Sequence, residues 1–560
     1  MLAGFTLVTL FSASPTFATS DGVSGTVVVS RIQADGSTRW ETIARSQLSV
    51  ASELSPQGRG RIVAISENAE FVEFAIPNDP LFSEQWNFSQ IGATAAWDQA
   101  TGAGVVVAIL DSGVDPGPDL ACRTFVSPYN AFTGLGSMGD VLDGTGHGTH
   151  ITGTVAQCTN NGTGVAGLAY GATIMPVKVL DDTGSGDAAS VANGIAYAVS
   201  QGADVINLSL GFACNGQTWP TCSVSAIDTE IAAAVAAGVT IVAASGNDGS
   251  AETSYPAGHP LVVAVGATDS SGGQASYSNG GTSLDVVAPG GDTVDRDSSG
   301  NPDLIWQESL DEFGVPDIIG MFGTSMSSAH VTATVALMLE RNPTWTPLRT
   351  RCVLIETASD IGASGFDSAT GWGEIDPTRA ATHTGEAFSD ITSGWFVPAV
   401  DFVAQQSIAQ GYDDCTFGPN DEVSRAEMVT LLSRATGLDP VSSPAGIFTD
   451  VPKTSVFAPY IEAAAGAGWV TGYPDGSFDP GASITRAEVA ALSSRLWGPG
   501  AGGQSSPFTD VVPGAWYHGD VVDSWDIGAV NGYGDGTYRP DGNMTRAEAA
   551  QIIFNMLAVV

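Results

Sequence analysis

Short, continuous apolar runs alternate with glycine-rich segments through the middle of the chain. Two of them, Val105–Leu110 and Thr240–Ser245, are rich in β-branched residues. Such runs are typical of strands covered on both faces of a parallel sheet. Longer stretches, at 148–157 and from Met326 to about Leu339, predict helices. The centre of the chain is therefore predicted to be an α/β domain with a parallel sheet and helices on both faces.

The N-terminal region has a different pattern. An apolar run from Leu2 to Phe11 is followed by small residues before Ala18, which is typical of a signal peptide over residues 1–18. The run is too short to span a bilayer, and no later segment is predicted to do so. Apolar and polar residues then alternate, which predicts a small α+β domain over residues 19–77.

The last third of the chain repeats itself. Phe-Ser-Asp at 388–390 recurs as Phe-Thr-Asp at 448–450 and 508–510, a period of 60 residues (448 − 388 and 508 − 448). Each copy is followed by a Gly-Tyr-x-Asp turn and then by a Ser/Thr-Arg-Ala-Glu segment, which begins at 424, 485 and 545. Fixed spacing predicts three structural units, each made of a helix, a turn and a second helix.

The start of each second helix carries an arginine that capping does not explain. The Ser/Thr is an N-cap and the Glu three residues later completes a capping box. Between them lies a cation at the first helical position, where it opposes the helix dipole. A repeated arginine there suggests an anion held by the helix N-terminus and the guanidinium together. These residues are Arg425, Arg486 and Arg546.

Three glycine-rich segments present side chains suited to acyl transfer. Asp111 ends the first buried strand, His147 opens a helix in DGTGHGTH, and Ser325 opens another in GTSMSSAH. Each alone fits an ordinary turn, packing or capping role. Together they supply the carboxylate, imidazole and hydroxyl of an activated serine.

With their glycines and in this order, these segments resemble the subtilisin-like serine proteases (subtilases) over roughly residues 78–380. The resemblance implies that Asp111 orients His147, the general base, and that Ser325 is the nucleophile. His150 competes for the role of base, but in the family's H-G-T-H pattern the first histidine holds it. Asn247, in the motif A-x-G-N, and the Ser325 N–H would stabilise the oxyanion.

The resemblance also outlines a substrate site and one departure. Small residues would form the two walls of the specificity pocket, and glycine-rich residues an edge strand that pairs with the substrate backbone. The walls are Ser209, Leu210 and Gly211 with Ala243, Ala244, Ser245 and Gly246, and the edge is Gly184, Ser185 and Gly186. Ala329 stands where the family has proline. Alanine in place of proline frees φ and adds a backbone N–H near the nucleophile.

The segment 158–165 resembles a calcium loop of thermostable subtilases. Calcium takes six to eight oxygen ligands, many of them carbonyls. The ligands implied are the carbonyls of Cys158, Thr163 and Val165, the side chain of Asn161, and the carboxylates of Asp79 and Asp119. An ordinary Asn-Gly loop is the alternative interpretation.

Six cysteines in an exported chain predict disulfides. Cys214 and Cys222 lie in one loop beside the pocket wall and form the first expected pair. The calcium loop would bring Cys122 near Cys158. A bridge between the remaining Cys352 and Cys415 would join two domains.

The three C-terminal repeats resemble S-layer homology modules, which anchor proteins to bacterial walls. They are expected at 386–438, 446–498 and 506–560. The resemblance implies that the three arginines contact an acidic wall polysaccharide. Repeat 1 departs from the pattern because Cys415 replaces the turn glycine, which is Gly476 or Gly536 in the other repeats.

The charge narrows the possible partners. The net charge is −41 and Lys178 and Lys453 are the only lysines, which excludes nucleic acid. This charge suits a soluble exported protein, and base-composition bias in the genome explains it equally well. Residues 19–77 occupy the place of the family's inhibitory propeptide, with a junction near Pro77. The sequence thus predicts a secreted, wall-anchored serine endopeptidase; the alternatives are a catalytically silent surface or adhesion protein and, less favoured, an intracellular enzyme.

Overall fold

The computed structural model describes three strands before residue 76 and then residues 76–296, 302–384, 388–498 except 389, 392, 407, 410, 413 and 414, and 505–557. The chain divides into two compact units, Met1–Ala75 and Ile76–Val560. The predicted leader at 1–18 lies outside the described residues. In the described part of the chain, no helix is both long and apolar enough to cross a membrane.

The described part of the first unit is an antiparallel sheet with the strand order β2-β1-β3. The strands are β1 (Thr26–Ile32), β2 (Thr38–Ala44) and β3 (Ile62–Glu67). The alternating apolar pattern therefore did indicate strands. Any helix of the predicted α+β domain would fall outside the described residues.

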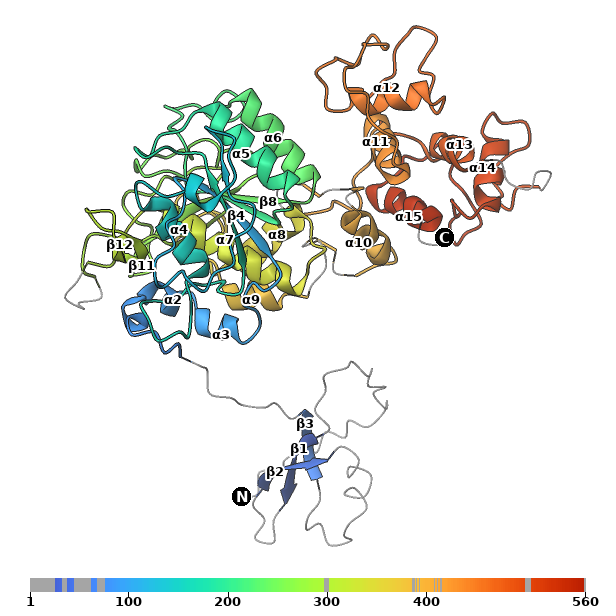
Figure 1. Ribbon diagram of the computed structural model, residues 1–560. Coiled ribbons are helices and arrows are strands. Elements are labelled where there is room, and N and C mark those ends of the chain that lie inside the picture. The colour runs from blue at the N-terminus through green and yellow to red at the C-terminus, as the bar shows by residue number, and fades with distance from the viewer. Residues whose placement is uncertain are drawn as a thin grey trace. The chain divides into compact units, whose positions relative to one another are not determined.

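A parallel sheet of seven strands forms the centre of the second unit (Figure 1), in the order β10-β9-β8-β7-β4-β6-β5. Four of these strands end in polar residues, Asp111, Asn130, Lys178 and Thr268, and open α/β sheets place their ligands at the carboxyl ends of the strands. The strands are β4 (Val106–Asp111), β5 (Tyr129–Asn130), β6 (Thr173–Lys178), β7 (Val205–Leu208), β8 (Thr240–Ala244), β9 (Val263–Thr268) and β10 (Val286–Pro289).

Helices cover both faces of this sheet, as the continuous apolar runs predicted. Val107 and Ile109 of β4 enter one core with α4 (His147–Ala156) and α7 (Thr324–Arg341). Ala108 and Leu110 enter the other core with α5 (Ala188–Ser200) and α6 (Ser225–Ala236). Alternate residues of one strand thus face opposite layers, because successive side chains of a strand point to opposite sides.

Smaller elements complete this domain. An antiparallel hairpin of β11 (Ile305–Leu310) and β12 (Pro316–Met321) packs on α4 and leads directly into α7. Short helices add to the layer that contains α7. They are α2 (Trp86–Gln90), α3 (Ala93–Trp97), α8 (Pro347–Thr357) and α9 (Pro377–Thr382).

Each C-terminal repeat consists of two helices in the described residues. They are α10 (Val397–Gln405) and α11 (Arg425–Thr436), α12 (Ala458–Gly466) and α13 (Arg486–Trp497), and α14 (His518–Asp526) and α15 (Arg546–Leu557). The predicted capping boxes are present at the start of α11, α13 and α15. The first helix of each repeat packs on the second helix of a neighbouring repeat: α12 on α11, α14 on α13, and α10 on α15.

The three repeats close into a ring. Ile484 donates its backbone N–H to the carbonyl of Val423, Met544 to that of Ile484, and Val423 to that of Met544, each at 2.9 Å. These residues occupy equivalent positions just before the three second helices. Each repeat therefore donates one backbone N–H to one neighbour and accepts one from the other. With three repeats, each of these three N–H groups and each of these three carbonyls has a partner.

All three predicted disulfides are confirmed: Cys122–Cys158, Cys214–Cys222 and Cys352–Cys415. The third joins α8 of the α/β domain to repeat 1. Cys415 has a φ of +63°, and the equivalent Gly476 and Gly536 have +84° and +79°. The turn of repeat 1 thus keeps the left-handed backbone of the other repeats, although its residue carries a side chain.

Candidate active site

Asp111 and His147 are joined by a hydrogen bond. Asp111 is the last residue of β4, His147 is the first of α4, and Oδ1 lies 2.7 Å from Nδ1. The carboxylate is fully buried and also accepts the Ser112 N–H at 2.7 Å. Burial lowers the pKa of His147, whereas the charge and hydrogen bond of Asp111 and the charge of Asp143 raise it. The raising effects outweigh burial, so the pKa of His147 lies above its ordinary value.

Ser325 is the second residue of α7, and a glycine turn leads into it. Gly323 has a φ of +147°, and a Cβ there would lie 3.4 Å from Asn247 Nδ2. Ser325 Oγ donates to the Ser209 carbonyl at 3.4 Å. Within the described residues it makes no hydrogen bond to His147. Catalytic hydrogen bonds are often long in free enzymes and tighten when substrate binds.

Asn247 is held at one end of its amide. Oδ1 accepts the backbone N–H and the hydroxyl of Thr324, both at 2.9 Å. The NH₂ group is left to donate to a ligand beside the N-terminus of α7. That is the arrangement required of an oxyanion donor.

Asp143 is a functional residue that the sequence analysis missed. Its Oδ1 accepts from Ser112 Oγ at 2.8 Å and from the Gly146 N–H at 3.0 Å, and its Oδ2 accepts from the Thr149 N–H at 2.9 Å. It thereby joins the loop after Asp111 to the start of the helix that carries His147. Its position four residues before His147 in the same glycine-rich motif was the available signal.

His150 is fully buried and has a different environment from His147. Nε2 lies 2.9 Å from the Ile305 carbonyl, and burial lowers the pKa to about 3. A neutral imidazole that faces a hairpin carbonyl is placed for packing rather than for proton transfer.

A cavity of about 610 Å³ opens beside His147. Its walls include Gly184, Ser185 and Gly186 on one side and Ser209, Leu210 and Gly211 on the other. Apolar side chains of Val191, Ile227 and Tyr255 add to its lining. These two predicted substrate segments are therefore brought together with the histidine.

The other predicted wall, residues 243–246, does not line this cavity. Ala243 and Ser245 are fully buried, and Ser245 Oγ donates to the Asn279 carbonyl at 2.9 Å. Gly246 reaches the α7 turn, where its N–H donates to Thr324 Oγ1 at 3.2 Å. These residues support the Asn247 loop, and their contact with substrate stays a prediction.

The carboxylates predicted to bind calcium converge on the 158–165 loop. Asp79 Oδ2 accepts the Asn160 N–H at 2.9 Å, and Asp119 Oδ1 accepts from Asn161 Nδ2 at 2.6 Å. Burial raises the pKa of Asp119, Asp79 adds to the rise, and hydrogen bonds from the loop offset it only in part. A buried acidic pair of this kind suits a hard cation. In the described part of the chain, including this loop, no group of three or more His, Cys, Asp or Glu residues is arranged to hold a metal ion.

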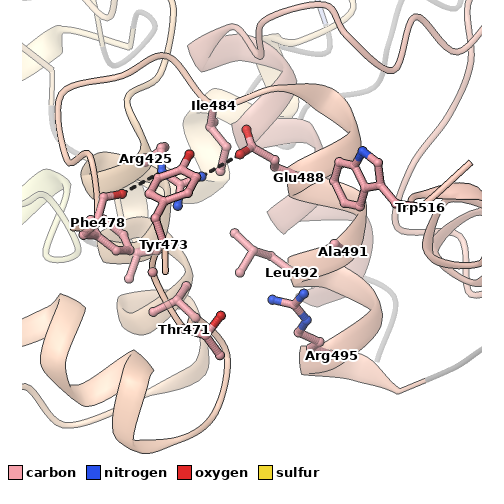
Figure 2. A pocket seen from close by; sticks show the side chains of 13 residues that line it. Arg425, Thr471, Tyr473, Phe478, Ile484, Glu488, Ala491, Leu492, Arg495 and Trp516 are labelled. Carbon is pink, nitrogen blue, oxygen red and sulfur yellow. Dashed lines mark hydrogen bonds and ion pairs between the residues drawn. The ribbon is translucent and has the colours of Figure 1, made fainter. Parts of the chain in front are cut away.

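The three repeat arginines have partners within the ring. Arg425 pairs with Glu488 at 2.6 Å, Arg486 with Glu548 at 2.7 Å, and Arg546 with Glu427 at 4.0 Å. Each glutamate is the capping-box residue of a neighbouring repeat. Capping within one repeat did not explain the arginines, whereas these ion pairs between repeats do (Figure 2 shows Arg425 and Glu488). Contact of the arginines with an external anion stays a prediction.

Comparison with known proteins identifies both regions. Residues 102–373 match the Subtilase family, and residues 387–429, 447–490 and 507–550 match the S-layer homology domain.

Subtilisin E of Bacillus subtilis (strain 168) is 40% identical over 290 residues, which are 51% of this chain and 68% of that protein. Subtilisin of Bacillus pumilus is 39% identical over 290 residues, 51% of this chain and 94% of that protein. A solved structure of a protease from Pseudoalteromonas arctica is 32% identical, covers 55% of this chain and 99% of its own, and has a TM-score of 0.49. The chain belongs to the subtilase family and is a subtilisin-type serine endopeptidase that carries three S-layer homology domains.

Proposed function

We propose that Asp111, His147 and Ser325 form the catalytic triad. Asp111 accepts the Nδ1–H of His147, which leaves Nε2 free to take the proton of Ser325 as Oγ attacks the peptide carbonyl. The same imidazole then gives that proton to the leaving amine. The 2.7 Å bond between the buried carboxylate and the imidazole, at the mouth of a cavity, is the observation that carries this assignment.

The oxyanion of the tetrahedral intermediate is stabilised by Asn247 Nδ2 and by the Ser325 N–H. The anchoring of Asn247 Oδ1 by Thr324 supports this role, because it orients the donor before substrate arrives. In subtilisin itself, a relative of this chain, loss of such a donor costs ~10²–10³ in turnover.

The substrate is an extended protein segment. Its backbone pairs with the edge at Gly184, Ser185 and Gly186, and a side chain enters the apolar cavity beside Leu210. Backbone pairing is indifferent to sequence, so broad cleavage of unfolded protein is expected.

Replacement of the nucleophile tests the triad. Ser325→Ala should abolish casein cleavage and labelling by a fluorophosphonate probe, and should leave residues 19–77 attached. Ser200→Ala, which changes an exposed serine of α5, is the matched control and should label like the wild type. Undiminished casein cleavage by purified Ser325→Ala would overturn the assignment.

The enzyme is exported and held at the cell surface. A leader at 1–18, an inhibitory propeptide at 19–77 and a peptidase domain at 78–380 precede three modules, in which Arg425, Arg486 and Arg546 contact an acidic wall polysaccharide. The three matches to the S-layer homology domain support surface attachment. The net charge of −41 would repel an acidic polymer, so attraction requires local cations.

A structural calcium ion stabilises the peptidase domain. Asp79, Asp119 and the Asn161 side chain would hold it together with the carbonyls of Cys158, Thr163 and Val165. The buried acidic pair on this loop supports the site, because a cation would stabilise the charged form of Asp119, whose pKa is raised mainly by burial and further by Asp79. The ion supplies no step of the reaction.

A further inference from the structure

A buried cation at the carboxyl edge of the parallel sheet has no part in the mechanism proposed above. Lys178 is the last residue of β6, and the parallel register of β4 and β6 places it beside Asp111. It is the only lysine of the peptidase domain, in a chain whose net charge is −41. Its side chain is only 8% exposed. Because a buried charge is costly unless it is paired and hydrogen-bonded, the partners of Lys178 indicate what it does.

The ammonium group of Lys178 contacts two oxygen atoms of unequal importance. It donates one N–H to the backbone carbonyl of Ser112, a residue that is fully buried. It also pairs with Asp182 Oδ1 at 2.9 Å, but the Asp182 side chain is 75% exposed. Water screens an exposed ion pair, so this contact contributes little. The charge-assisted bond to the buried carbonyl is therefore the stronger of the two.

Ser112 connects the aspartate of the proposed triad to the helix that carries the histidine. Its backbone N–H donates to Asp111 Oδ1 at 2.7 Å, and its hydroxyl donates to Asp143 Oδ1 at 2.8 Å. The same hydroxyl oxygen accepts the backbone N–H of Gly148, the residue after His147, at 3.0 Å. A movement of Ser112 would thus displace both partners of the bond between Asp111 and His147.

The backbone at residues 112–113 fits closely between its neighbours. A Cβ atom added to Gly148 would lie 2.2 Å from the Gly113 carbonyl oxygen. Gly113 has a φ of +115°, and a Cβ atom there would lie 2.3 Å from the Val141 carbonyl oxygen. This segment is therefore wedged between the start of α4 and the chain that leads to Asp143. Close-packed interiors transmit a displacement to their neighbours.

We propose that Lys178 is a positioning residue for the catalytic triad. Its ammonium group fixes the Ser112 carbonyl and so holds Asp111 and the start of α4 where the imidazole can take the proton of Ser325. Lys178 acts through Ser112 and not on the reacting atoms. The proposal rests on the proposed triad and adds a residue on which the geometry of that triad depends.

Substrate binding should not depend on Lys178. Among the described residues that line the cavity beside His147, Lys178 is absent. The turn that leads into the substrate edge is held by Asp181, whose Oδ1 accepts the Thr183 N–H at 2.8 Å and the Ser185 N–H at 3.1 Å. These bonds are made without the ion pair between Lys178 and Asp182. Loss of Lys178 should therefore lower kcat and leave KM almost unchanged.

Steady-state kinetics of the full chain on a chromogenic peptide test this division. Lys178→Met keeps an unbranched side chain but removes the charge and the donors. It should lower kcat roughly tenfold or more, because small displacements of reacting groups cost up to about a hundredfold. KM should change by less than about twofold.

Two control variants separate the contacts of Lys178. Lys453→Met makes the same change at the other lysine of the chain, which is exposed in repeat 2, and should leave kcat unchanged. Asp182→Asn removes only the ion pair and should change kcat by less than about twofold. If Asp182→Asn reproduces the effect of Lys178→Met, or if the loss appears in KM, Lys178 serves the substrate edge and the proposal is wrong.

A spectroscopic readout tests the geometry without turnover. In the Ser325→Ala chain, the far-downfield proton resonance of His147 Nδ1–H reports its hydrogen bond to Asp111. Lys178→Met should shift or abolish this resonance, and Lys453→Met should leave it in place. Lys178→Arg keeps a charged donor and should retain more of the resonance and of kcat. If Lys178→Met is unfolded by its melting curve, Lys178→Arg decides alone: retention of both supports the contact, and loss of both overturns it.

The outcomes distinguish this proposal from the one on which it rests. If the parent chain does not cleave the peptide, the proposed triad itself is wrong. If the parent is active and Lys178→Met matches Lys453→Met in kcat and in the resonance, the triad stands and the positioning role of Lys178 is wrong.

Discussion

Removal of Arg486 should weaken the whole ring of repeats. Among the three repeat arginines its side chain is the most buried, at 7% exposure against 14% for Arg425 and 11% for Arg546. Besides the pair with Glu548, its Nε–H donates to the Tyr538 carbonyl at 2.8 Å and an Nη2–H donates to the Asn531 carbonyl at 2.9 Å. All of these partners belong to repeat 3.

The size of the effect follows from what Arg486→Ala leaves behind. Two carbonyls and one carboxylate lose a partner, and breaking a buried pair costs about 3–5 kcal/mol. Glu548 keeps hydrogen bonds from Tyr533 Oη and from the Thr545 N–H, so we expect the lower value, about 3 kcal/mol. At about 2–4 °C per kcal/mol for a unit of this size, the melting temperature of the repeats should fall by roughly 6–12 °C.

Differential scanning calorimetry of the full chain, with Ser325→Ala as the parent, measures this fall. Arg539→Ala is the control, because Arg539 pairs with Asp535 at 2.9 Å while both side chains are more than half exposed. It should melt like the parent. If Arg486→Ala and Arg539→Ala melt at the same temperature, the arginines do not hold the ring together.

Two further predictions concern the peptidase domain. Casein cleavage should rise with pH through a pKa above 6.5, because catalysis requires neutral His147 and the pKa of that imidazole is raised. Asp143→Asn removes one negative charge and should move this limb to lower pH; an unmoved limb would contradict the electrostatic role given to Asp143. Chelation of calcium should lower the melting temperature of this domain and speed its self-digestion, because an ion that binds only the folded state stabilises it by mass action. Asp119→Ala should remove most of the chelator's effect, and identical melting of the wild type with chelator and with calcium would exclude the site.

The α/β core could be predicted from short segments because its chemistry is local. Val105–Leu110 carries both the signal of a strand buried on two faces and the aspartate at its end. His147 and Ser325 were also visible from local sequence, because each opens a predicted helix shortly after a glycine, Gly146 and Gly323. The role of Asp143 was less visible, since it acts through hydrogen bonds to loops that are brought together only by the fold.

The ring of repeats shows where the sequence was insufficient. Capping boxes at Ser424 and Thr485 are contained within four residues and were predicted. The partner of Arg425, by contrast, is Glu488, which is 63 residues away along the chain. One repeat considered alone leaves the arginine unexplained, because the pairing exists only after three repeats have closed on one another. Likewise, the pocket that Trp516 lines together with Arg425 and Tyr473 exists only after segments of three repeats have come together (Figure 2).

The Cys352–Cys415 bridge changes what a cut in the chain would do. The peptidase domain and repeat 1 are joined once by the polypeptide between α9 and α10 and a second time by this disulfide. A protease that cleaves extended segments can also cleave the peptide that connects its own domains. With two covalent links, a single nick there leaves the enzyme on its anchor. Release into the medium requires a cut and a thiol reductant together, so the bridge makes detachment depend on the redox state of the surroundings as well as on proteolysis.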